Sequence, residues 1–81
     1  MFYNVCVEAK VDVDTKGNNY MTQNHYYKDE KNAKEFFHKL VNHYNEQRVK
    51  HGDKPIESSS IEYFDNENDV FIFIEMCFFK D

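Results

Sequence analysis

The chain of 81 residues has only two cysteines, two glycines, one proline and no tryptophan. Small secreted domains usually carry several disulfides, so two cysteines favour a reducing compartment, and we expect a cytoplasmic protein. Gly17 and Gly52 lie in separate turn-like segments, which excludes a glycine-rich phosphate loop. The longest apolar stretch, Val70 to Ile74, is far too short to span a bilayer. The first residues lack a basic and then apolar segment, so we expect no signal peptide.

Positive charge is also scarce. The 15 acidic and 10 basic side chains give a formal net charge of -5, and Arg48 is the single arginine. Such a chain repels phosphate groups, which argues against non-specific binding to DNA or acidic membranes. With 41% hydrophobic and 31% charged residues, the composition is that of a globular protein, and the length corresponds to one domain, residues 1–81.

Leucine is nearly absent, whereas phenylalanine, tyrosine and valine are abundant. Aromatic and β-branched residues favour pleated sheets, so the apolar composition predicts a sheet-rich fold. The odd-numbered residues from Tyr3 to Val13 are apolar and alternate with a mixed set, which is typical of a strand with one face on a core. Turn-forming residues occupy 14–19, and residues 20–27 read as a polar, second strand at a sheet edge.

An amphipathic helix of about twenty residues is predicted after Asp29, which is suited to cap its N-terminus. Its apolar side chains recur at three- and four-residue spacing and form one stripe: Ala33, Phe36, Phe37, Leu40, Val41 and Tyr44. Gly52 is suited to follow the helix end, and Pro55 prevents its resumption.

The C-terminal part reads as a hairpin, with strands at 61–64 and 69–80 around a turn at 65–68. The fold class is therefore α+β, a two-layer ββαββ domain with one helix on a four-stranded, mostly antiparallel sheet. The first and last strands are apolar on both faces, so we place them together in the centre as a parallel pair, in the order 2-1-4-3. The order 1-2-3-4 is the alternative.

One helix covers one face of a sheet, yet apolar side chains occur on both. The face away from the helix is expected to carry Phe2, Cys6, Phe71, Phe73, Cys77 and Phe79. Exposed patches of this kind mark interaction sites, so we expect a covering partner: a second copy of the chain, another protein or a nucleic acid. The alternative is that loops and the segment 53–60 cover the patch. A disulfide between Cys6 and Cys77 is a further alternative to two free thiols.

Nucleic-acid binding has two possible bases. Phe71 and Phe73 have the aromatic-x-aromatic spacing of RNA-recognition strands. However, Asp69 replaces the basic residue of that motif, Val70 and Ile72 replace its small residues, and Glu75 puts a carboxylate on the stacking face. Mimicry of DNA would use an acidic cluster, and the last hairpin supplies one: Glu57, Glu62, Asp65, Glu67 and Asp69, with Glu8, Asp12 and Asp14 along the first strand. Solvated charges that protect a sheet edge explain this cluster equally.

Catalytic and metal sites find little support. His38 and His43 are five residues apart on the predicted helix and do not share a face, and no cysteine or histidine pair has zinc-ligand spacing. Residues 12–19 resemble a calcium loop only faintly, because no bidentate glutamate stands at the required distance. Both cysteines lie in apolar strands, where burial raises a thiol pKa and lowers its reactivity. We expect no enzyme, no cofactor and no metal.

The sequence therefore predicts a non-enzymatic protein–protein interaction module. Frequent Asn, Lys, Phe, Tyr and Ile indicate AT-rich codons, as in bacteriophages of low-GC hosts, and suggest a phage protein that binds a host protein in the host cytoplasm. The alternatives are a homodimeric structural or accessory protein and a nucleic-acid-linked protein.

Overall fold

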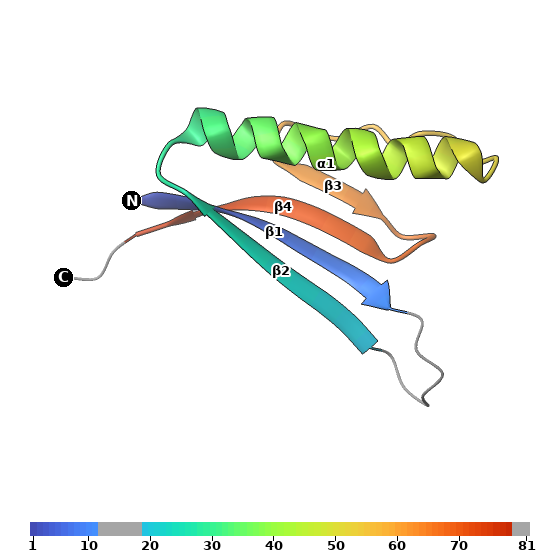
Figure 1. Cartoon of the computed structure of the whole chain (residues 1–81), viewed down its shortest axis with the longest axis horizontal. Coiled ribbons are helices and arrows are strands. Elements are labelled where there is room, and N and C mark those ends of the chain that lie inside the picture. Colours follow the sequence, from blue (N-terminus) through green and yellow to red (C-terminus); the bar gives the residue numbers. More distant parts are fainter. Residues whose placement is uncertain (12–18, 79–81) are drawn as a thin grey trace.

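The computed structural model describes residues 1–11 and 19–78. The elements in these residues are β1 (Phe2–Val11), β2 (Asn19–Tyr27), α1 (Glu30–Lys50), β3 (Glu62–Asp65) and β4 (Val70–Cys77). Figure 1 shows the strands as one sheet with α1 across one of its faces. The predicted two-layer α+β fold and the order β2-β1-β4-β3 are both confirmed. Phe79, Asp12, Asp14 and most of the predicted turn at 14–19 lie outside the described residues.

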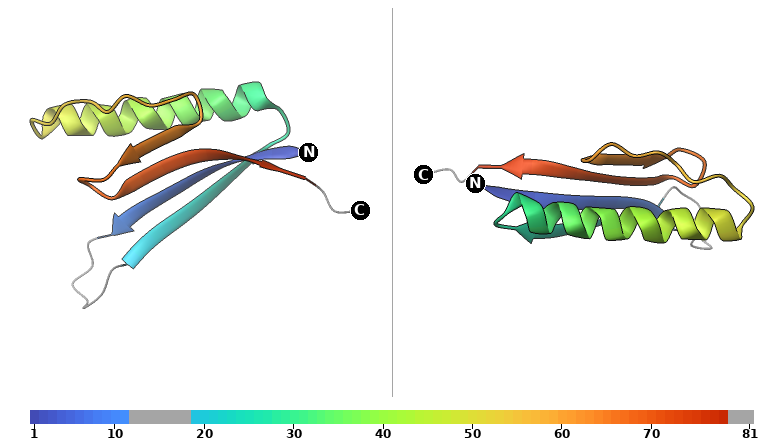
Figure 2. Two further views of the ribbon diagram at one scale, coloured as in Figure 1. Left: turned by 180° about the vertical axis from the view of Figure 1, so that it is seen from behind. Right: turned by 90° about the horizontal axis from the view of Figure 1, so that it is seen from above.

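The predicted parallel pairing of the central strands is wrong. β1 and β4 run antiparallel, with Phe2 opposite Cys77 and Ala9 opposite Val70. The cause is the segment 51–61, which runs back along α1 before β3 begins (Figure 2). A direct connection from α1 into β3 would have reversed both strands of the last hairpin, and β4 would then have run parallel to β1.

Two hydrogen bonds hold the returning segment against the helix. The Asn45 side chain donates to the Ile56 carbonyl at 3.0 Å and accepts from the Ile56 backbone N–H at 2.9 Å. The Tyr63 hydroxyl donates to the same Asn45 oxygen at 2.9 Å. One amide side chain in the C-terminal half of α1 thus links the helix, the returning segment and β3.

Both predicted ends of α1 are confirmed. The Asp29 carboxylate accepts from the backbone N–H of Asn32 at 2.8 Å, which is the geometry of an N-cap. After Lys50 the chain leaves the helix through His51 and Gly52, and Gly52 has a φ of 85°, where a side chain would be strained.

The core lies between α1 and the sheet. Its buried apolar residues are Tyr3, Val5, Val7, Ala33, Phe37, Val41, Tyr63, Val70 and Ile72. Met76 lies on the same face of β4 as Ile72 and Ile74, but its side chain is 61% exposed. The β3–β4 ladder ends at Phe73, and one further hydrogen bond joins the Ile74 N–H to the Ile61 carbonyl at 2.9 Å. Beyond Ile74, β4 is itself an edge of the described sheet, so Met76 lacks a neighbouring strand on that side.

Candidate protein-binding surface

The face of the sheet opposite α1, here called the reverse face, is built from alternate residues of all four strands. The strand register brings even-numbered residues of β1, β2 and β3 together with odd-numbered residues of β4. The side chains of this face that the structure describes are Phe2, Asn4, Cys6, Glu8, Lys10, Thr22, Asn24, Tyr26, Glu62, Phe64, Phe71, Phe73, Glu75 and Cys77.

The predicted interface residues lie together on this face. Phe2, Phe71, Phe73 and Cys77 are half-buried, and Phe73 stands opposite Cys6 in the register. Cys6 is only 5% exposed, so it contributes little surface to a partner because its neighbours already cover it.

Two aromatic residues of the reverse face escaped sequence reasoning. The Tyr26 ring packs edge-on against Phe2 with centroids 5.6 Å apart, and the Phe64 ring packs in the same way against Phe71 at 5.8 Å. Both are well exposed, Tyr26 at 63% and Phe64 at 46%. The alternation of side chains within β2 and β3 could have indicated that Tyr26 and Phe64 face away from their immediate neighbours. Which face of the sheet they occupy, however, depends on the strand register.

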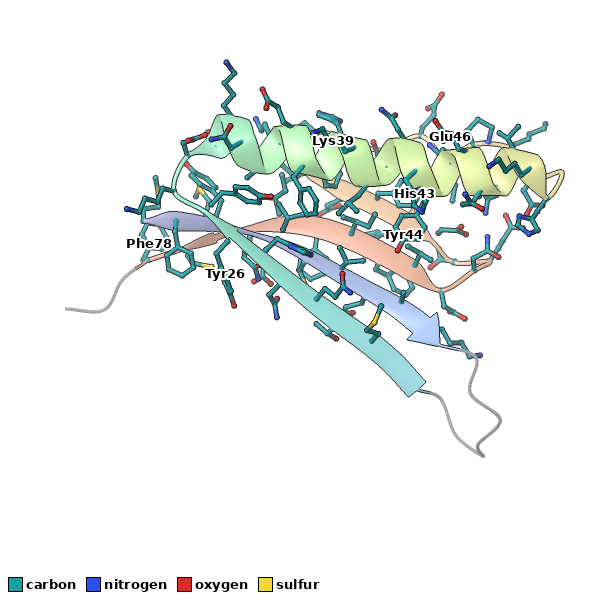
Figure 3. All side chains as sticks on the ribbon, viewed as in Figure 1. Tyr26, Lys39, His43, Tyr44, Glu46 and Phe78 are labelled. Carbon is teal, nitrogen blue, oxygen red and sulfur yellow. The ribbon has the colours of Figure 1, made fainter. Side chains whose placement is uncertain are left out.

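No segment within residues 1–11 and 19–78 forms a second layer over the reverse face. Figure 2 shows α1 and the segment 51–61 on the same side of the sheet, and Ile56 packs against the core under the helix. The alternative that residues 53–60 cover the patch is therefore wrong. In Figure 3 Tyr26 lies on the far side of the sheet from Lys39 and Glu46, which project from the outer side of α1.

The centre of the reverse face is polar and closely packed. The Asn4 side chain is buried and donates to the Asn24 oxygen at 2.9 Å, while its own Oδ1 has no hydrogen-bond partner among the described residues. Burial raises the pKa of the Cys6 thiol, and the charges of Glu8 and Glu75 raise it further. The predicted raised pKa is thus confirmed for Cys6, and this thiol is held in its unreactive, protonated form.

Both cysteines are free. Cys6 stands opposite Phe73 and Cys77 opposite Phe2, so the two are offset by four residues along their strands. This offset corresponds to about 13 Å, whereas a disulfide requires Cα atoms within about 7 Å. The disulfide alternative is therefore excluded in this fold.

Carboxylates surround the phenylalanines of the reverse face. Glu8 stands directly opposite Phe71, and Glu62 stands opposite Phe73. Glu75, on the same strand as both rings, is exposed. These charges disfavour the stacking of nucleic-acid bases on the rings, because each phosphate would approach a carboxylate.

The predicted acidic patch loses one member. Asp65 is only 2% exposed and is bound by Arg48, so it does not belong to an exposed surface. Glu57, Glu62 and Glu67 are exposed, whereas Asp69 lies 3.9 Å from the Lys10 ammonium. The charges around the last hairpin are therefore partly neutralised, which weakens the case for DNA mimicry.

Arg48 and Asp65 form a buried ion pair that sequence reasoning missed. The guanidinium donates to Asp65 at 2.9 Å, to the exposed Glu67 at 3.1 Å and to the Lys54 carbonyl at 2.7 Å. Asp65 also accepts from the backbone N–H and side chain of Asn68. The only arginine of the chain, at the end of a helix, was the available signal. The ion pair therefore links the C-terminal end of α1 to the hairpin formed by β3 and β4.

This network shifts the pKa values of both partners. Burial alone would raise the pKa of the Asp65 carboxyl, but hydrogen bonds from Asn68 and Arg48, together with the arginine charge, bring it below its ordinary value. The hydrogen bond to Asp65 raises the pKa of Arg48, against the effect of burial. A small hollow of about 170 Å³ adjoins the pair and is lined by residues that include Tyr44, Gln47 and His51. Arg48 and Asp65 are hydrogen-bonded to each other, so neither presents an unpaired charge to this hollow.

The histidines are dispersed. His25 packs its ring against Phe36 with centroids 4.6 Å apart, and His38 and His43 are exposed on α1. Over residues 1–11 and 19–78, no three side chains of the metal-ligating types form a group that could hold an ion.

In the described part of the chain, no helix has both the length and the hydrophobicity required to cross a bilayer. Comparison with known proteins identifies no relative: no family model matches the chain, and neither does any curated protein or solved structure.

Proposed function

We propose that this protein is a non-enzymatic protein-binding module and that the reverse face of its sheet is the contact surface. The observation that carries the proposal is the partial exposure of Phe71 and Phe73 on the strand that also supplies the buried Val70 and Ile72. Completing the burial of each ring would contribute about 1 kcal/mol, and a partner protein obtains this gain by covering the face.

The shape and composition of the reverse face also favour a protein partner. Aromatic pairs stand at two separated places on the sheet, Phe2 with Tyr26 and Phe64 with Phe71. Tyrosine and phenylalanine are enriched among the residues that dominate binding energy at protein interfaces. The surface between them is mixed with amides and carboxylates, which is typical of non-obligate interfaces.

The proposal includes no catalytic activity, and the state of the Cys6 thiol supports this part of it. Cys6 is buried, and its raised pKa keeps it protonated. The buried charged pair Arg48 and Asp65 is saturated with hydrogen bonds that hold the fold together. Phage origin, a cytoplasmic location and a host protein as partner stay predictions from composition.

A selection from a random peptide library on the immobilised protein tests the proposal. Tyr26→Ser combined with Phe64→Ser removes the two most exposed rings of the reverse face with little cost to the core. Lys39→Ser combined with Glu46→Ser is the matched control on the outer side of α1. We expect selected peptides to bind the control like the unaltered chain and to lose about tenfold or more in affinity for the double aromatic variant. Equal binding to both variants would refute the proposal.

A further inference from the structure

We propose that the partner of the reverse face is a basic, amphipathic protein segment, in which lysine or arginine side chains flank aromatic or aliphatic anchors. This inference rests on the proposed function and adds the chemistry of the partner. It follows from the arrangement of charge and apolar surface on the face.

The reverse face is acidic. Glu8, Glu62 and Glu75 come from three different strands, so their charges are spread over the face and not confined to one edge. The cation on the same face, Lys10, lies 3.9 Å from Asp69 and is thereby offset. The remaining polar side chains that the structure describes there are neutral: Asn4, Thr22 and Asn24.

Each phenylalanine of β4 lies one strand away from a carboxylate. Phe71 is directly opposite Glu8 and Phe73 directly opposite Glu62, and side chains in such positions have Cβ atoms about 5 Å apart. Lysine and arginine lay their aliphatic stems on apolar surface while the charged head reaches a polar neighbour. A cationic side chain resting on Phe71 or Phe73 would therefore present its charge to the adjacent glutamate.

One corner of the face is hollowed for an apolar anchor. Phe2, Tyr26, Tyr27 and Lys28 line a shallow, mostly apolar hollow of about 470 Å³. This space accepts an aromatic or aliphatic side chain of a partner, of the kind that supplies much of the affinity at protein interfaces. Lys28, beyond the end of β2, brings a positive charge to this corner, so an uncharged anchor fits there better than a basic one.

The same charges disfavour a second copy of the chain as the occupant. Two reverse faces stacked on each other would place the Glu8, Glu62 and Glu75 side chains of both copies in one interface. Like charges brought together in a partly desolvated interface cost free energy, whereas a basic partner converts them into attraction.

Three synthetic peptides of nine residues test this inference. They alternate phenylalanine with lysine, with glutamine or with glutamate, and each is titrated into the isotopically labelled protein at low salt. We expect the lysine peptide to shift the backbone amide signals of β1 and β4 and to bind about tenfold more tightly than the glutamine peptide, with the advantage falling at high salt. The glutamate peptide is expected not to bind.

Charge-matched variants assign the effect to the face. Glu8→Gln, Glu62→Gln and Glu75→Gln together should remove the advantage of the lysine peptide. Glu35→Gln, Glu46→Gln and Glu57→Gln change the net charge equally but lie elsewhere on the surface, and they should preserve it. If both triple variants lost the tighter binding of the lysine peptide, the inference would be overturned. The net charge of the protein, and not the charges of the reverse face, would then determine the affinity.

Other results separate the inference from the proposed function. If the glutamine and lysine peptides bind the reverse face equally, the basic partner is excluded while protein binding stands. Sedimentation of the chain alone at micromolar concentration should show a monomer. A dimer that dissociates on Tyr26→Ser and Phe64→Ser would overturn the inference in favour of a second copy. If peptides shift signals of α1 and not of β1 and β4, both the inference and the proposed function fail.

Discussion

The two faces of the sheet are built from the same strands but differ in what covers them. In β4, Ile72 is buried under α1, whereas the next residue, Phe73, is partly exposed on the reverse face. Both side chains are apolar and both lie in the centre of the sheet. An apolar strand therefore has side chains that can be buried on both of its faces. Which of them are buried depends on where another layer, here α1, packs against the sheet.

Charges follow the same division. On the helix side, Asp65 is buried and fully engaged by Arg48 and Asn68. On the reverse face, Glu8, Glu62 and Glu75 stand beside phenylalanines without a cation bound to them in the ion pairs of the described residues. A charge that serves the fold is paired within the chain, and we infer that the unpaired charges serve recognition.

Phe37→Ala should have the largest effect on stability. Phe37 has no exposed surface, so its truncation leaves a cavity and should lower the free energy of unfolding by about 3–5 kcal/mol. Phe71→Ala on the reverse face is the matched control and should cost less, about 2 kcal/mol, because part of that side chain is already in water. Urea unfolding followed by circular dichroism measures both. Equal losses would mean that the reverse face is covered in the folded protein.

Asp65→Ala should come next. The substitution leaves the Arg48 guanidinium buried beside an apolar methyl and removes the acceptor of the turn, so we expect a loss of about 3 kcal/mol. Glu67→Ala is the control, since this carboxylate also contacts Arg48 but is 71% exposed, and its loss should stay below about 1 kcal/mol. A small effect for Asp65→Ala would show that the ion pair does not hold α1 to the hairpin.

Acid should weaken the fold through the same carboxyl. The pKa of Asp65 in the folded chain lies below its ordinary value of 3.8, so the contribution of its ionised form is present above pH 3.8. This contribution is lost as the pH falls through the lower, folded pKa. We expect unfolding midpoints in urea to decrease below about pH 4 and the decrease to be shallower in Asp65→Asn. Identical pH profiles for the two proteins would contradict the pKa shift.

The last prediction concerns the reactivity of the two thiols and not the free energy of unfolding. Cys6 is buried with a raised pKa, whereas Cys77 is only half-buried near the end of β4. Ellman's reagent should therefore modify Cys77 about tenfold faster than Cys6 at pH 8. Cys6→Ser and Cys77→Ser, measured separately, assign the two phases. Faster modification of Cys6 would show that the centre of the reverse face is open.

Local patterns in the sequence predicted most of the elements. The alternation from Tyr3 onward, the N-cap at Asp29 and the glycine after the helix each depend on neighbouring residues, and all are confirmed. The position of β2 at an edge followed from its polarity and is confirmed as well. Four of the six predicted interface residues lie half-buried on the reverse face, and Cys6 lies there but is covered.

Contacts between segments distant in the chain were harder to predict from the sequence. The burial of Asp65 depends on Arg48, seventeen residues earlier in the chain. The cluster of acidic residues around Asp65 in the sequence does not indicate this contact. Tyr26 and Phe64 come from weakly patterned edge strands, so only the register with β1 and β4 places them beside Phe2 and Phe71.

The amino-acid sequence by itself determined the strands, the helix with its ends, and the excess of apolar side chains over the area that one helix covers. These properties arise from backbone periodicity and the chemistry of adjacent residues, which act over a few positions. The tertiary structure alone decided the direction of β4, because that direction depends on the path of residues 51–61. Asn45 holds this path against the helix, and a hydrogen bond between segments eleven residues apart has no counterpart in any local pattern.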